Sequence, residues 1–254
     1  MTKTILVLPD SHYPDTDMRI WRAILRIIKD NPPDEIIHIG DLLDYPQPSR
    51  WTKGTKDEFE GSVLDDSKRA VKNLLEPLRE VYNGPIGIHE GNHDLRPRAY
   101  LKKYAPALAE SKAFNFENLL EFDRLEITRL PDFYGFAPGW LSTHGHLGGI
   151  RLNQNAGYTA LNGAKRIGKS IVMGHTHRAG IGNFTTGLAG DTHLTTGIEV
   201  GHIMDPKKVT YLKGATGNWQ QALGMLTIDG KHVTPTLMPI SAGKIIYNKE
   251  VYKI

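Results

Sequence analysis

Five short apolar segments of the chain each end in a cluster of Asp, His, Asn and Gly residues. The segments cover residues 3–8, 35–39, 85–89, 139–143 and 170–173, and their length and β-branched content are typical of buried strands. Helical spacing separates the first three, with residues 17–30 placing Trp21, Ile24 and Ile28 on one face. This alternation predicts a mainly parallel sheet. Because ligands bind beyond the carboxyl ends of parallel strands, we expect the five clusters to converge.

The remaining segments predict further layers around that sheet. Helices are expected over 57–82, with a break near Pro77, and over 98–108, 115–122 and 154–167. Short strands are expected at 125–129 and 133–136. After residue 180 the chain is β-rich, with candidate strands at 194–198, 209–212, 221–228 and 232–238. Since no repeat or linker interrupts the 254 residues, we expect one domain over 1–254.

Composition excludes several classes of protein. The chain has no Cys, which excludes disulfide scaffolds, thiolate zinc sites and thiol catalysis. Its net charge of +3 is well below that of a dedicated nucleic-acid-binding protein. No apolar run approaches the ~20 residues that span a bilayer, and the first residues lack the features of a signal peptide. We therefore expect a cytoplasmic protein that does not bind membranes.

The clusters contain the residue types that bind divalent metals. They are Asp10-Ser11-His12, Gly40-Asp41-Leu42-Leu43-Asp44, Gly91-Asn92-His93-Asp94, His144-Gly145-His146 and Gly174-His175-Thr176-His177. Asp, His and Asn without Cys suit Mn, Fe, Zn, Ni or Mg. One tetrahedral metal needs fewer ligands than these clusters offer, so we expect a two-metal site with a bridging carboxylate, of the kind that acts on phosphoryl groups.

The order of these clusters resembles the five motifs of calcineurin-like metallophosphoesterases. D-x-H, G-D-x-x-D, G-N-H-D, a strand-terminal H and G-H-x-H follow one another over residues 4–178. The resemblance implies a four-layer αββα sandwich of the α/β class, with residues 180–254 supplying the second sheet. That late segment is also similar to small metallophosphoesterases encoded by phages.

The resemblance also implies a role for each motif residue. Asp10, His12 and His177 would hold one metal, Asn92, His144 and His175 the other, and Asp41 would bridge them. His93 would assist the leaving oxygen while a metal-bound hydroxide attacks phosphorus. Asp94 would orient His93, Asp44 would be an outer partner of the centre, and His146 and Arg96 would contact substrate. Manganese is the metal we expect first.

The substrate class is less constrained by the motifs. In phosphoprotein phosphatases of this family, Arg continues the second motif, whereas Tyr45 stands here. We therefore expect phosphodiesters such as small or cyclic nucleotides or nucleic-acid ends. Arg96, Arg98, Lys102 and Lys103 interleave with aromatic residues after the third motif, so either base stacking or a plain solvated helix face remains open. A phosphomonoesterase and a non-catalytic metal-binding scaffold are the alternatives, and no protein partner can be inferred.

One further motif matches a nucleotide-binding pattern. Residues 163–170 read G-x-x-x-x-G-K-S, but a functional phosphate-binding loop follows a strand and opens a helix. Here a helical pattern precedes the motif and a strand pattern follows it. We expect Gly168 to end a helix instead.

Overall fold

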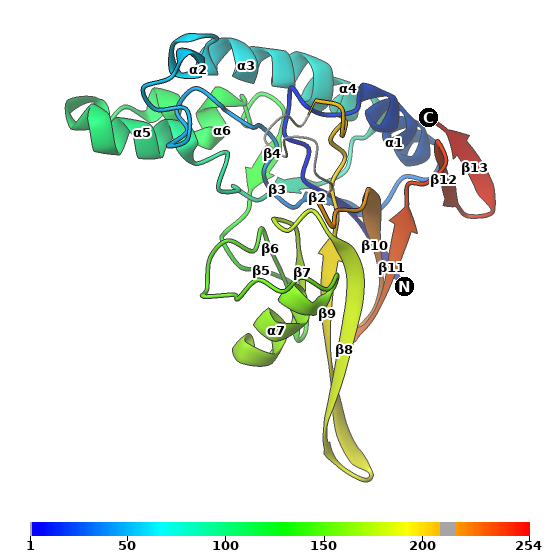
Figure 1. The fold of residues 1–254 in the computed structure, drawn as a ribbon. Helices are drawn as coiled ribbons and strands as arrows, with labels where there is room; N and C mark the ends of the chain where they lie inside the picture. The colour runs from blue at the N-terminus through cyan, green and yellow to red at the C-terminus, as the bar shows by residue number, and fades with distance from the viewer. Residues whose placement is uncertain (1, 209–216) are drawn as a thin grey trace.

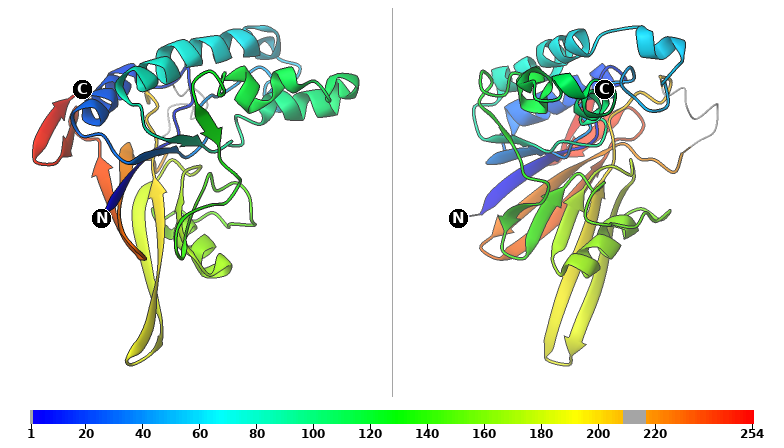
Figure 2. Two further views of the ribbon diagram at one scale, coloured as in Figure 1. Left: turned by 180° about the vertical axis from the view of Figure 1, so that it is seen from behind. Right: turned by 90° about the vertical axis from the view of Figure 1, so that its left-hand side faces the viewer.

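Two β-sheets pack face to face between two layers of helix (Figure 1 and Figure 2). The computed structural model describes residues 2–208 and 217–254, so the strand predicted at 209–212 lies outside the described residues. The first sheet has the order β11-β10-β1-β2-β3-β4 and the second has the order β5-β6-β7-β9-β8. The strands of the first sheet are β1 (Lys3–Leu8), β2 (Glu35–His38), β3 (Ile86–Ile88), β4 (Ile127–Arg129), β10 (Ala222–Asp229) and β11 (His232–Pro239). Those of the second are β5 (Tyr134–Ala137), β6 (Trp140–Thr143), β7 (Ser170–Met173), β8 (Ala179–Leu188) and β9 (Asp191–Val200).

Helices cover the outer face of each sheet. The first sheet carries most of them, and α7 lies alone on the second (Figure 1). The α-helices are α1 (Met18–Asp30), α2 (Lys56–Phe59), α3 (Val63–Ala70), α4 (Glu76–Val81), α5 (Arg96–Tyr104), α6 (Phe116–Leu119) and α7 (Tyr158–Ile167). A π-helical turn (Val71–Leu75) joins α3 to α4, and short 3₁₀ turns lie at Pro106–Leu108 and Lys112–Phe114. None of the helices in the described residues is long and apolar enough to cross a bilayer.

Three separate apolar clusters fill the three interfaces between these four layers. In β1, Leu6 and Leu8 pack toward the helices, whereas Ile5 and Val7 pack toward the second sheet. This division follows from strand geometry, since successive side chains point to opposite faces. The third cluster joins Ala160 and neighbouring residues of α7 to β7. The predicted four-layer αββα sandwich is confirmed.

The late part of the chain is shared between the two sheets. Strands β8 and β9 belong to the second sheet, in line with the expectation for residues 180–254 although β8 was not predicted as a strand, whereas β10 and β11 extend the first sheet. Strand β10 runs antiparallel to β1, with Lys3 opposite Ile228. Because β1 is buried on both faces, its free edge needs a partner strand, and β10 provides it. The expectation that all of 180–254 builds the second sheet is therefore wrong for β10 and β11.

Two β-hairpins differ in how they pack against the rest of the protein. The hairpin of β8 and β9 belongs to the second sheet, and its distal end extends beyond the other strands (Figure 1). A second hairpin, formed by β12 (Lys244–Tyr247) and β13 (Glu250–Lys253), lies beside α1, where Asn31 Nδ2 donates to the Tyr252 hydroxyl at 3.0 Å.

Two predicted helix boundaries have clear local causes. The helix expected over 57–82 breaks at Gly61 (φ +87°), and near the predicted break at Pro77 the helix continues through the π-helical turn Val71–Leu75 that directly precedes α4. Helix α7 ends at Gly168 (φ 77°), whose N–H donates to the Ala164 carbonyl at 2.8 Å, and β7 follows. The helix therefore precedes the strand, so residues 163–170 do not form a phosphate-binding loop.

Candidate metal centre and its cleft

The five motif clusters converge at the carboxyl ends of β1, β2, β3, β6 and β7. Within the described residues, three groups of side chains place ligand atoms within 4.8 Å of one another. The groups are Asp10, His12 and His177; His12, Asp44 and His93; and Asp41, His144 and His175. All seven residues predicted as metal ligands thus lie in or beside one centre, with Asn92 joined to it through His144.

Asp41 occupies the middle of this centre. Its Oδ2 lies 3.2 Å from His144 Nε2, 3.6 Å from His12 Nε2 and 4.0 Å from His93 Nε2. Its Oδ1 accepts the backbone N–H of His93 at 2.8 Å. One carboxylate oxygen therefore faces imidazoles from three different loops, as a bridging ligand would.

The surrounding donors point at one another rather than at solvent. His12 Nε2 and His177 Nε2 are 3.0 Å apart, and His177 Nε2 is 3.4 Å from Asp10 Oδ2. On the other side of Asp41, His144 Nε2 lies 3.1 Å from Asn92 Oδ1. Such side chains share the space that a cation would occupy between them.

One buried oxygen gives a direct test of whether a cation fits. Asp10 Oδ2 accepts the N–H of His175 at 2.9 Å, but Asp10 Oδ1 is buried with no hydrogen-bond partner among the described residues. A buried carboxylate oxygen without a partner is costly. Carboxylate, amide and imidazole donors together suit divalent cations, so the residues fit the metal that the motifs imply.

The electrostatics keep several of these imidazoles neutral, the form that binds metals. Burial, followed by the nearby His144, lowers the pKa of His175 to about 4, and burial holds the pKa of His177 well below its usual range. His144 differs: burial acts to lower its pKa, but the Asp41 carboxylate outweighs this and raises it to about 9. Burial raises the pKa of Asp10 to about 8. Binding a divalent cation here would therefore release protons.

The loops reach these positions with strained backbone. His12, Asp41, His175 and His177 all adopt positive φ, between 48° and 68°, a region that non-glycine residues rarely occupy and that clusters at functional sites.

Adjacent glycines leave room for the carboxylates. A Cβ on Gly174 would lie 2.1 Å from Asp10 Oδ1, and one on Gly91 would lie 2.1 Å from Asp41 Oδ1.

His93 lies beside Asp41 and is held from both ends of its ring. Its Nδ1 is 2.7 Å from Asp44 Oδ1, and its Nε2 is 3.1 Å from Nη2 of Arg96. Arg96 Nη1 donates to the Asp44 carbonyl at 2.6 Å. Burial lowers the pKa of His93, but Asp41 and the hydrogen bond to Asp44 outweigh it, so the net pKa is raised.

The orienting role predicted for Asp94 is not what the structure shows. The Asp94 carboxylate accepts backbone N–H groups from Gly91 at 2.9 Å, Leu43 at 3.0 Å and Leu42 at 3.3 Å. It therefore ties the loop after β2 to the loop after β3. The carboxylate that is hydrogen-bonded to Nδ1 of His93 belongs to Asp44, because the loop after β2 brings Asp44 alongside this nitrogen.

A cleft of about 530 Å³ opens beside the centre. It is lined by Pro48, Ser49, Arg50, Trp51, Asn92, His93, Arg96, Ala99, Tyr100, Lys103, Tyr104, His146 and His175. Both predicted substrate contacts, His146 and Arg96, are in this set. The two ring nitrogens of His146 are buried and have no hydrogen-bond partner among the described residues, so this imidazole is available to a ligand in the cleft.

Two aromatic residues near the centre were not predicted to take part. Trp51 lines the cleft, and Trp219 meets the His177 ring edge-on, with ring centroids 4.6 Å apart. Neither residue lies in a periodic pattern or a spaced motif. Only the fold brings them to the site.

Comparisons with known proteins agree with this geometry. The family model described as calcineurin-like phosphoesterase matches residues 3–188. The Gene 54 proteins of Mycobacterium phages L5 and D29 are 49% and 50% identical to the chain over 255 residues. Each match covers 100% of this chain and 100% of the phage protein.

Solved structures are similar at much lower identity. Vps29 of Entamoeba histolytica, complexed with zinc, is 12% identical with a TM-score of 0.46, covering 99% of this chain and 98% of that one. The E. coli phosphoesterase YfcE is 15% identical with a TM-score of 0.39, covering 94% and 100%. The family model spans most of the chain, including all five motifs. The chain belongs to the calcineurin-like phosphoesterase family.

Proposed function

We propose that this protein hydrolyses phosphodiesters with two divalent metal ions, and that its substrates are small or cyclic nucleotides or nucleic-acid ends. The observation that carries the proposal is the position of Asp41. Its Oδ2 lies between His12 on one side, at 3.6 Å, and His144 on the other, at 3.2 Å. A carboxylate in that place is suited to bridging two metals.

The donors around Asp41 divide into two sets. Asp10, His12 and His177 would hold one ion, and Asn92, His144 and His175 the other, with Asp41 common to both. Two divalent ions bound there supply Lewis acidity toward the phosphoryl oxygens and lower the pKa of water. Manganese is the ion we propose, and Fe, Zn, Ni and Mg suit the same donors.

His93 is placed to handle the proton of the leaving oxygen. Asp44 holds Nδ1, so Nε2 faces the cleft beside Arg96. In the structure Nε2 accepts from Arg96 Nη2, so Nε2 would carry a proton for the departing oxygen once Arg96 donates to the phosphate instead, and the Asp44 carboxylate would stabilise the charged ring. His146 and Arg96 would contact the phosphate from the cleft wall.

The residue after Asp44 favours a diester over a phosphoprotein. Tyr45 is fully buried, and its hydroxyl lies 2.6 Å from Ser67 Oγ. The chain thus offers no arginine at the position where phosphoprotein phosphatases of the family have one. A dianionic monoester would receive less positive charge there than it does in those enzymes.

The proposal is tested with metal-stripped protein to which Mn²⁺ is restored. We expect bis-p-nitrophenyl phosphate to be hydrolysed faster than p-nitrophenyl phosphate, and the His93→Ala variant to keep its metal while losing most turnover. Preference for the monoester would make the protein a phosphomonoesterase. Bound metal without turnover of either ester, with Mn²⁺, Ni²⁺, Zn²⁺ or Mg²⁺, would indicate a scaffold.

A further inference from the structure

The cleft beside the metal centre has a second part that the phosphoesterase motifs do not explain. Residues 48–51 and α5 contribute Trp51, Tyr100 and Tyr104, which we call the aromatic wall. Trp51 is 75% exposed and Tyr104 is 42% exposed. Large aromatic side chains gathered in one open cleft mark a ligand-binding surface.

Cations lie against these rings. Arg50 Cζ is 4.6 Å from the Trp51 ring centroid, and Lys53 Nζ is 4.2 Å from that of Tyr104. Lys103 Nζ is 5.1 Å from the Tyr104 centroid. The residues that line the cleft include Arg50, Arg96 and Lys103 but neither Asp nor Glu. The aromatic wall therefore combines partly exposed aromatic rings with positive charge, and a stacking base would share these rings with the cations or displace them.

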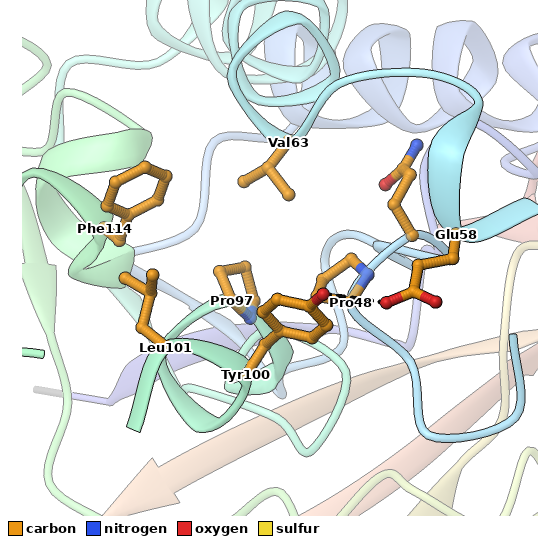
Figure 3. Close-up of a pocket in the computed structure, with 8 residues that line it drawn as sticks. Pro48, Glu58, Val63, Pro97, Tyr100, Leu101 and Phe114 are labelled. Carbon is orange, nitrogen blue, oxygen red and sulfur yellow. Dashed lines mark hydrogen bonds between the residues drawn. The ribbon is translucent and has the colours of Figure 1, made fainter. Parts of the chain in front are cut away.

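The wall is held in place from behind. Glu58 accepts a hydrogen bond from the Tyr100 hydroxyl at 2.7 Å (Figure 3). It also accepts from Lys53 Nζ at 2.5 Å and from the Gly54 N–H at 2.6 Å. Glu58 and Tyr100 also line a neighbouring, mostly apolar cavity of about 250 Å³ (Figure 3). These bonds join the loop that carries Lys53 to α5 and hold Tyr100 and Lys53 in place, which reduces the entropy that these two side chains would lose on binding a ligand.

We propose that the aromatic wall is a base-stacking subsite and that the substrate is single-stranded nucleic acid, whose bases lie on Trp51 and Tyr104 while a neighbouring phosphodiester reaches the metal centre. Aromatic faces interleaved with cations are the means by which proteins bind single strands irrespective of sequence. A phosphopeptide would use the cations but has no need of exposed rings. This inference rests on the proposed function, because it names the substrate of the same site.

The binding test separates bases from charge. Metal-stripped protein is titrated with a thymidine octanucleotide and with an abasic octanucleotide of the same charge, at one salt concentration. We expect the thymidine strand to bind at least about tenfold more tightly. Trp51→Ala and Tyr104→Ala should remove most of that difference, whereas Arg50→Gln should weaken both strands alike.

A matched control lies on the projecting hairpin. Phe184 is 39% exposed, and Lys165 Nζ lies 3.9 Å from its ring centroid. Phe184 and Lys165 are thus an aromatic ring with a nearby cation, like Tyr104 and Lys53, but they do not line the cleft. Phe184→Ala should leave the preference for bases unchanged. Equal binding of the two strands, or a preference that survives Trp51→Ala and Tyr104→Ala, would overturn the subsite.

A kinetic test then places the subsite next to the chemistry. Thymidine 5′-(p-nitrophenyl phosphate) and methyl p-nitrophenyl phosphate share a leaving group and differ only in the nucleoside. With Mn²⁺ restored, we expect the nucleoside ester to have a KM about tenfold lower, and Trp51→Ala to raise that KM without a matching change in kcat. Equal KM values contradict the subsite alone. Turnover of neither ester contradicts the proposed function, and the octanucleotide titration still decides whether the wall binds bases.

Discussion

Asp44 Oδ1 lies 2.7 Å from Nδ1 of His93 and also 3.2 Å from Nδ1 of His12. A single carboxylate thus orients both the proposed proton donor and a proposed metal ligand. Burial acts to raise the pKa of Asp44. The hydrogen bonds that Asp44 makes with His12 and His93, and the charges of these two rings, outweigh burial and hold the pKa well below its usual range. Asp44 therefore stays ionised and can fix both rings in the tautomer that leaves Nε2 directed at the centre.

Asp44→Asn should lower kcat about 10- to 100-fold and weaken metal binding, because a neutral amide oxygen accepts from the two rings more weakly and no longer stabilises a charged His93 ring. The control is Asp94→Asn, which replaces one of the two carboxylate oxygens that accept backbone N–H groups from Gly91, Leu42 and Leu43. That variant should lose about 1–3 kcal/mol of unfolding free energy and less activity. The measurements are kcat at saturating Mn²⁺ and urea unfolding. A larger loss of kcat in Asp94→Asn than in Asp44→Asn, at equal metal content, would return the orienting role to Asp94.

Gly174→Ala should weaken metal binding while leaving most of the fold intact. The added Cβ would lie 2.1 Å from Asp10 Oδ1 and 2.4 Å from Ile39 Cγ2, so the Asp10 carboxylate has to move. Gly135→Ala in β5 is the matched control, since the nearest atoms to its Cβ, which belong to β6, are 4.0 Å away. Calorimetric titration with Mn²⁺ should show a weaker Kd only for Gly174→Ala. Unchanged affinity would show that Asp10 is not a ligand.

The stability of the metal-stripped protein should fall below pH 6.5. Burial, followed by the nearby His144, lowers the pKa of His89 to about 3, and its Nε2 lies 2.8 Å from Ser142 Oγ. The folded state keeps this ring neutral, whereas the unfolded chain protonates it near pH 6.5, so its stabilisation is present above 6.5 and is lost as the pH falls toward 3.

His89→Gln isolates that contribution. Between pH 7 and pH 5, the drop in unfolding free energy should be smaller in the variant by about 2 kcal/mol. Urea titrations at the two pH values measure it. Identical pH dependence in both proteins would mean that folding does not lower the pKa of His89.

Lys169→Ala should leave diesterase activity within about twofold of the parent protein, in line with an exposed surface change. Lys169 is exposed just after the end of α7. Steady-state kinetics, together with an ATP-binding titration, checks this. ATP binding that disappears with Lys169→Ala but survives Asp41→Asn would restore the nucleotide-binding interpretation of residues 163–170.

The parts of the fold predicted from sequence are those in which local pattern and tertiary packing agree. Strands β1 and β7 match their predicted bounds because each is a continuous apolar run that ends at a ligand cluster. Strand β8 was missed because most of its residues are exposed, so it shows no apolar run. The pairing of β10 with β1 joins segments that are more than 200 residues apart in the sequence. The local spacing of apolar residues carries no information about such a contact.

The candidate site also has a part that the sequence predicted and a part that only the structure shows. The order of the motifs predicted that Asp41, His144 and the other donors would converge at strand ends. It did not predict that β1, β2 and β3 end there from the first sheet and β6 and β7 from the second. It did not separate Asp44 from Asp94, because both carboxylates fall in motif loops and only the path of the backbone decides which one meets His93. Trp51 is brought to the cleft by a loop without periodicity, so its role depends on the structure.

The central claim, that two metal ions share Asp41 and drive phosphodiester hydrolysis, is tested most directly by titrating Mn²⁺ into metal-stripped protein while following bis-p-nitrophenyl phosphate hydrolysis. We predict two bound ions per chain, activity that appears as the second site fills, and loss of both binding and activity in Asp41→Asn. Full activity in excess chelator, or two bound ions and undiminished turnover in Asp41→Asn, would contradict the account.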